Sequence, residues 1–200
     1  MAFFAGVFIP LMTRTMKDSM DINPDLDTDD KRSVAALFTF ILLGVGEILG
    51  GIMFVGPIRD KYGNRVAYIV QMILTALAVA NVLYYNNQDT YNWAAYSMCF
   101  FWGIQDSGIN CLINCMLGFE FDDKTTPFGV FKFVQSLAIF GFSNVSSAVM
   151  SSDNSVGDQK KYILIYLLSA GIFGFLSMIA MLFFDFKPEE TKDDKFNELS

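Results

Sequence analysis

The chain has 200 residues, of which 53% are hydrophobic and only 18% are charged, and its net charge at pH 7 is −7. This composition is too apolar for an ordinary soluble domain, and the acidic balance provides no basic surface for nucleic acid. Histidine is absent, which removes the commonest catalytic bases and metal ligands. We therefore expect no enzyme, no bound cofactor and no metal site.

The first twelve residues are apolar but too few to cross a bilayer. Arg14 and Lys17 follow them directly, so we expect residues 1–13 to be the end of a longer, truncated transmembrane helix. A secretory signal is the alternative, but no basic segment precedes the apolar residues. Residues 14–33 are rich in acidic side chains, and we expect an acidic loop there. This loop lacks the glycine and glutamate positions of a calcium-binding loop.

Five later segments are long enough to span a bilayer, which takes about 20 helical residues. Each of them is bounded by charged or turn-forming residues. The segments are Val34–Val55, Val66–Tyr85, Trp93–Leu117, Phe128–Met150 and Tyr162–Phe184. They predict an all-α integral membrane protein, with a five-helix bundle over residues 34–185 and a charged tail over residues 186–200.

The first span contains a single carboxylate, Glu47, near its middle. Because an ionised group at mid-depth costs a few kcal/mol, Glu47 is either a proton or cation site or a protonated packing residue. Gly46 and Gly50 form a small-xxx-small pair, at which another helix can approach closely. Gly44 and Gly51 lie on the same helical face as Glu47. We expect all four glycines to serve helix packing.

Polar side chains also recur in the third and fourth spans. Asp106, Asn110 and Asn114 are spaced by four residues, which predicts one polar stripe facing the bundle interior. The stripe either lines a cavity or joins helices by hydrogen bonds worth about 1 kcal/mol each. Lys132 and Gln135 lie near the start of the fourth span, where the lysine can reach the headgroups, so anchoring is favoured over solute contact.

The segment Gly56-Pro57-Ile58-Arg59-Asp60-Lys61-Tyr62-Gly63-Asn64-Arg65 follows the first span. It resembles the loop signature of the major facilitator superfamily, in which a glycine precedes an aspartate with a basic neighbour, then a second glycine and a basic residue. The signature positions are Gly56, Arg59, Asp60, Lys61, Gly63 and Arg65. The resemblance implies that this loop is cytoplasmic and that Asp60 holds a helix end of the other half of the fold. It also implies that the tail over residues 186–200 is cytoplasmic and that the acidic loop over residues 14–33 is non-cytoplasmic.

Three further stretches resemble one branch of that superfamily, the Unc-ninety-three-like family. They are Gly44–Gly51, Gly103–Asp106 with Asn110, and Phe131–Leu137. The chain departs from the family pattern at Lys132, where arginine is usual, and at Cys111, where threonine is common. The resemblance covers residues 2–186 and implies the carboxy-terminal half of a twelve-helix fold.

By this resemblance, the chain is expected to regulate ion channels or to escort other membrane proteins by helix packing. One alternative is a secondary transporter of a small solute or ion, proton-coupled through Glu47 and Asp106. Another is a truncated structural subunit without activity of its own. The expected partners are the lipid bilayer and either another membrane protein or a missing amino-terminal half. The plasma membrane and the endomembranes fit the sequence equally.

Overall fold

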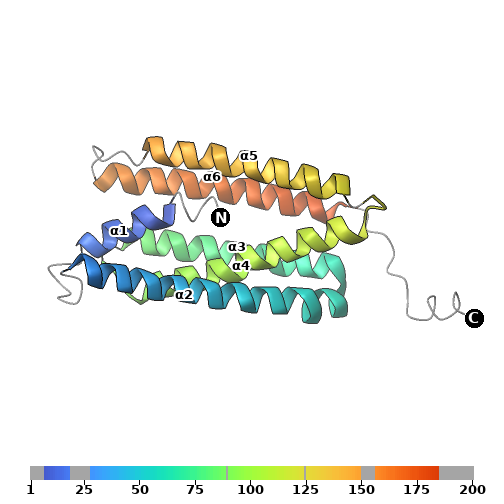
Figure 1. The fold of residues 1–200 in the computed structure, drawn as a ribbon, viewed down its shortest axis with the longest axis horizontal. Helices are drawn as coiled ribbons and strands as arrows, with labels where there is room; N and C mark the ends of the chain where they lie inside the picture. The colour runs from blue at the N-terminus through green and yellow to red at the C-terminus, as the bar shows by residue number, and fades with distance from the viewer. Residues whose placement is uncertain (1–6, 19–27, 89, 124, 150–155, 185–200) are drawn as a thin grey trace, which may run out of the picture.

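The computed structural model describes residues 7–18, 28–88, 90–123, 125–149 and 156–184, which are almost entirely helical and contain no strand. The elements are α1 (Ile9–Asp18), α2 (Asp29–Met53), η3 (Phe54–Ile58), α3 (Arg59–Asn87), α4 (Trp93–Phe119), α5 (Thr125–Val149) and α6 (Val156–Leu182) (Figure 1). Here η3 is a short π-helix. The predicted tail over residues 186–200 lies outside the described residues, as do residues 1–6 and 19–27.

The five predicted spans coincide with α2 to α6, but several helix ends differ from the prediction. α2 begins at Asp29, because the Thr28 hydroxyl accepts a hydrogen bond from the Lys31 N–H at 3.4 Å and acidic side chains favour a helix N-terminus. α1 continues to Asp18. The two helices therefore extend into residues 14–33, which were predicted to be a loop.

Three of the described helical segments are long and apolar enough to cross a membrane: Asp29–Met53, Arg59–Asn87 and Lys160–Leu182. α4 and α5 match predicted spans in position but are not among these three. Only 17% of the most apolar stretch of α2 is buried within the fold. A soluble monomer rarely exposes a contiguous apolar patch of more than a few hundred Å², so these side chains require lipid around them.

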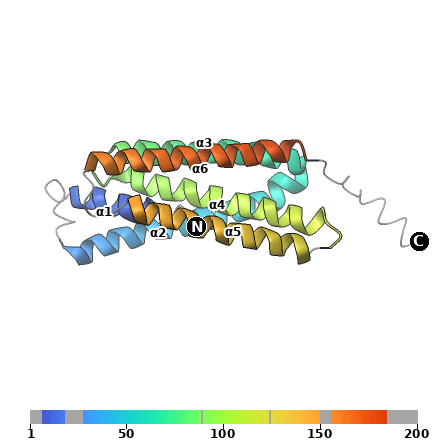
Figure 2. The ribbon, with the colours of Figure 1, turned by 90° about the horizontal axis from the view of Figure 1, so that it is seen from above.

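α4 lies at the centre of the bundle. It packs against α2 and against α3, and α3 in turn packs against α6, beside which it lies in Figure 2. α5 contacts α4 only weakly. Its first turn is fixed by the exposed Asp123, which accepts hydrogen bonds from the Thr126 hydroxyl at 2.6 Å and the Thr125 N–H at 3.0 Å. These two bonds hold the pKa of Asp123 below its ordinary value, because they stabilise the carboxylate.

α2 and α4 approach so closely that their backbones touch. A Cβ added to Gly50 would lie 2.5 Å from the carbonyl oxygen of Ile104. A Cβ added to Gly46 or Gly103 would overlap a backbone oxygen of the facing helix. None of the three positions has room for a side chain. Close approach of this kind stabilises helix pairs in lipid, where dispersion and hydrogen bonding replace the hydrophobic effect as the driving force.

The four predicted packing glycines do not all take part in this contact. Gly46 and Gly50 lie in it, and a Cβ on Gly51 would lie 3.2 Å from the Ser107 hydroxyl of α4. Gly44 has no atom of the described structure within 4 Å of an added Cβ, so the packing role predicted for it is wrong here. The reason is helical geometry, because a two-residue step from Gly46 turns about 200° around the axis.

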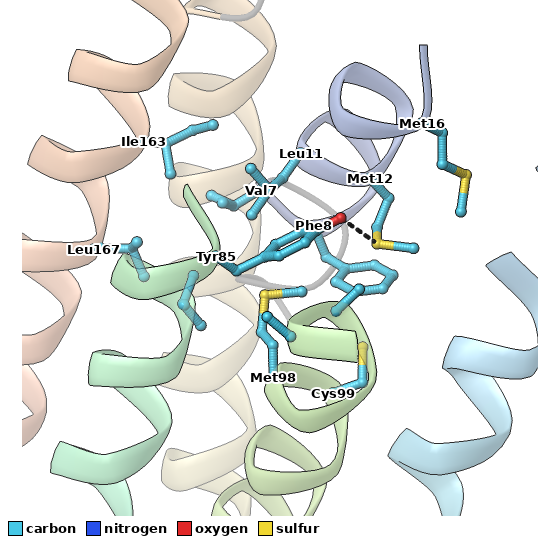
Figure 3. Packing of buried hydrophobic residues seen from close by; sticks show 13 residues of the cluster. Val7, Phe8, Leu11, Met12, Met16, Tyr85, Met98, Cys99, Ile163 and Leu167 are labelled. Atoms are coloured by element: carbon cyan, nitrogen blue, oxygen red, sulfur yellow. Dashed lines mark hydrogen bonds between the residues drawn. The ribbon is translucent and has the colours of Figure 1, made fainter. Parts of the chain in front are cut away.

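α1 is inserted at one end of the bundle between α3, α4 and α6 (Figure 3). The Tyr85 hydroxyl of α3 lies 2.5 Å from the Thr15 hydroxyl and donates to the Met12 sulfur at 3.6 Å. The surrounding buried cluster comes from these four helices and from the two residues before α1: Val7, Phe8, Leu11, Met12, Met16, Val82, Tyr85, Ala94, Ala95, Met98, Cys99, Ile163 and Leu167. α1 is thus part of the core.

The connection from α2 to α3 is helical over most of the predicted signature loop. η3 continues directly from α2, and α3 begins at Arg59. A kink interrupts α3 at Gly63, where φ is 82° and ψ is 168°. Among the described residues, Gly63 is the one with a positive φ. A residue with a Cβ is strained in that conformation, so the kink depends on glycine.

We expect Gly46→Ala to lower the stability of the protein by about 1–3 kcal/mol, because the added methyl group overlaps rigid backbone. Thermal unfolding in detergent measures the change. Gly44→Ala is the matched control: the same substitution, two residues away, enters open space. It should leave stability unchanged or raise it by up to about 1 kcal/mol through helix propensity. Equal losses in both variants would contradict the backbone contact.

Gly63→Ala should lower stability by about 1–2 kcal/mol through backbone strain alone, since no atom lies within 4 Å of the added Cβ. Gly129→Ala in α5 also enters open space but in a helix. It should therefore be stabilising by up to about 1 kcal/mol. The same unfolding assay compares the two variants, and a harmless Gly63→Ala would rule out the kink.

Candidate functional site

Two carboxylates on different helices lie close together within the membrane-spanning part of the bundle. Glu47 on α2 and Asp106 on α4 are near enough for their charges to interact, and both are half-buried. The glycine contact fixes this proximity. A Cβ added to Gly103 would lie 3.0 Å from the backbone nitrogen of Glu47, and Asp106 follows Gly103 by about one helical turn.

A cavity of about 370 Å³ lies between α3, α4 and α6. Its polar lining side chains are Tyr68, Thr75, Gln105, Asp106 and Ser177, and most of the remaining wall is apolar. Small-molecule sites in proteins occupy about 300–1,000 Å³ and combine an apolar wall with a few polar groups. Asp106 therefore belongs to the carboxylate pair and also lines a space that is large enough for a small solute.

The predicted polar stripe of α4 faces the bundle interior only in part. Asp106 lines the cavity, Asn110 is half-buried and donates to the Asp106 carbonyl oxygen at 2.7 Å, and Asn114 is exposed. A four-residue repeat advances by about 400°, so each member of the stripe is rotated by about 40° from the one before. The prediction of an interior position is therefore wrong for Asn114.

A cross-helix hydrogen bond beside the cavity involves a residue that was not among the predicted site residues. The side chain of Gln71 on α3 is fully buried and donates from Nε2 to the carbonyl oxygen of Gln105 at 2.7 Å. Its Oε1 lies against Gly108, where an added Cβ would be 2.5 Å away. This amide fixes α3 against α4 next to Asp106. The sequence feature that could have indicated this contact is the glutamine inside the second apolar span.

Lys132 and Gln135 do not join the carboxylate pair. Both belong to α5, where Lys132 is exposed and donates from Nζ to Oε1 of Gln135 at 3.0 Å. The same ammonium lies 5.1 Å from the centroid of the Phe131 ring. These contacts are all local to one helix. The structure therefore separates these two predicted residues from Glu47 and Asp106.

The signature segment forms its own contacts at the start of α3. Arg59 donates from Nε to Oδ1 of Asn64 at 3.0 Å, and its guanidinium lies 4.7 Å from the centroid of the Phe119 ring at the end of α4. A second guanidinium nitrogen lies 3.7 Å from a carboxylate oxygen of Asp60, which is itself exposed. Of the other signature residues, Gly56 lies in η3, Gly63 forms the kink in α3, and Lys61 and Arg65 are exposed.

A second polar network lies at the opposite end of α3, and it was not predicted. The buried Arg14 of α1 donates to the carbonyl oxygen of Asn86 at 3.1 Å and to its Oδ1 at 3.3 Å. Asn86 donates from Nδ2 to the Lys160 carbonyl oxygen of α6 at 3.3 Å. The network ties three helices together. Its signal in the sequence was the arginine placed directly after an apolar segment.

Most of the chain matches a known protein family. A family model described as Major Facilitator Superfamily matches residues 1–143, well over half of the chain. The matched part contains both carboxylates, the signature segment and the α2–α4 contact. No curated protein and no solved structure matches the chain. The apolar helical bundle and the family match lead to one conclusion, that this chain belongs to the major facilitator superfamily.

Proposed function

We propose that the chain provides the coupling site and the solute cavity of a secondary transporter. The observation that carries this proposal is the position of Asp106, which lines the cavity and interacts with Glu47 of a different helix. Carboxylates within a membrane are costly and usually face a partner or a water-filled cavity. A proton or a cation bound beside these two acidic residues would offset negative charge within the membrane.

The cavity provides the second requirement for coupling. A solute that contacts Gln105 or Trp102 also lies beside Asp106, because all three side chains line the same space. The charge or dipole of that solute changes the free energy of protonating Asp106. By linkage, proton binding then changes the affinity for the solute by the same factor. Glu47 would add a second proton-binding group at the α2–α4 contact without lining the cavity.

The Glu47→Gln/Asp106→Asn double variant should lower solute-dependent proton flux at least tenfold, because neither amide can exchange a proton. The measurement uses proteoliposomes with an imposed proton gradient, a pH-sensitive dye in the lumen and added amines, sugars or anions. Asp123→Asn is the control, since it removes a carboxylate from the exposed α4–α5 connection. Full proton coupling in the double variant would exclude this mechanism.

The Unc-ninety-three-like resemblance supports a second candidate, regulation or escort of an ion channel or another membrane protein. The favouring observation is α5, which contacts the bundle weakly and exposes a row of large apolar side chains: Val130, Phe133, Val134, Leu137 and Phe140. A partner helix gains contact energy by covering such a row. The pair Gly46 and Gly50 no longer supports this candidate, since α4 occupies it.

If α5 is the partner surface, Phe133→Ala/Phe140→Ala should reduce co-purification of a tagged channel subunit at least fivefold. The control, Phe173→Ala/Phe183→Ala, removes two equally exposed phenylalanines at α6 and its end. It should leave the yield of the partner unchanged. Equal losses from both double variants would indicate a general effect on folding or lipid contact and would count against this candidate.

A further inference from the structure

We propose that the cavity between α3, α4 and α6 binds an organic ammonium ion, that is, a small monocation with N–H donors and an apolar body. The inference names the solute class of the cavity and rests on the proposed transport function for its physiological role. The charge, the hydrogen-bonding groups and the apolar wall of the cavity each favour such a ligand.

The charge of the lining favours a cation. Among the described residues that line the cavity, Asp106 is the one acidic residue, and lysine and arginine do not occur. Glu47 adds a second acidic group close to Asp106. In a low-dielectric surrounding, an anion in this space would be repelled without compensation, whereas a monocation would offset the negative charge.

Two of the three hydroxyl groups that line the cavity, those of Thr75 and Ser177, favour a ligand that donates hydrogen bonds, whereas Tyr68 and the Gln105 amide carry donor hydrogens of their own. The Thr75 hydroxyl already donates to the Gln71 carbonyl oxygen at 2.9 Å, and the Ser177 hydroxyl donates to the Phe173 carbonyl oxygen at 2.9 Å. Each hydroxyl has one hydrogen, so both groups can only accept from a ligand. An ionised Asp106 also only accepts. An ammonium group matches this set of acceptors.

The rest of the lining suits an apolar body next to a positive charge. Trp102, Met178 and Met181 contribute an indole ring and two thioethers to the wall. Aromatic rings attract cations, and methionine side chains adapt to irregular apolar ligands. A volume of about 370 Å³ limits the ligand to a small molecule. An arylalkylamine combines the required charge, donors and size.

Trp102 can report binding directly, because the chain has two tryptophans and the other, Trp93, is highly exposed. In the full chain carrying Trp93→Phe, in detergent, Trp102 fluorescence is followed with three probes of similar size: phenethylammonium, 2-phenylethanol and phenylacetate. We expect a saturable change with phenethylammonium and at least tenfold weaker binding of the other two. Equal affinities, or no saturable change with phenethylammonium, would overturn the proposal.

Variants in the same background identify the group that recognises the charge. Asp106→Asn should weaken phenethylammonium binding at least tenfold and leave 2-phenylethanol binding unchanged, whereas Asp123→Asn should change neither. Gly174→Leu places a side chain in the cavity, from a position with no atom within 4 Å of an added Cβ, and should abolish binding even if Asp106→Asn fails to fold. Unchanged ammonium affinity in either Asp106→Asn or Gly174→Leu would refute the assignment.

The binding test and the transport test can each refute one proposal without refuting the other. If phenethylammonium binds selectively while the Glu47→Gln/Asp106→Asn variant keeps its proton flux, the transport proposal is wrong and the ammonium site stands. If proton flux requires both carboxylates while the three probes bind equally, the ammonium assignment is wrong and coupled transport stands.

Discussion

The backbone contact between α2 and α4 is the constraint on which the rest of the bundle depends. Gly46, Gly50 and Gly103 let the two helices meet without intervening side chains. Lipid tails are as apolar as the side chains themselves, so close packing has to provide much of the association energy. α4 also contacts α3, and α3 contacts α6. The position of α2 therefore influences the positions of the three helices that line the cavity.

The same contact brings the two acidic residues together. Glu47 and Asp106 belong to spans that are separated in the sequence by the whole of α3. As long as the glycines touch, the backbones that carry Glu47 and Asp106 keep a fixed separation. The structure therefore holds two acidic residues at one helix contact. Gln71 fixes the third helix at the same level.

Local patterns predicted much of this fold. Apolar length identified α2 to α6, and the spacing of Gly46 and Gly50 identified a packing face, because both properties depend on one helix at a time. Features that depend on which helices are neighbours could not be read in this way. The proximity of Glu47 to Asp106, the cavity and the exposure of Asn114 all belong to this second group. The kink at Gly63 was also missed, since a signature segment rich in charges was read as an open loop.

The insertion of α1 bears on the order in which the protein assembles. Leu11 packs in one cluster with Ile163 and Leu167, about 150 residues later in the chain. At a synthesis rate of about 5–20 residues per second, α1 waits roughly 8–30 s at the ribosome before α6 exists. α1 can therefore pack first against Tyr85 of α3 and Met98 of α4, and only later against α6. Its burial is complete only when α6 has been added, so this end of the bundle gains its full packing last.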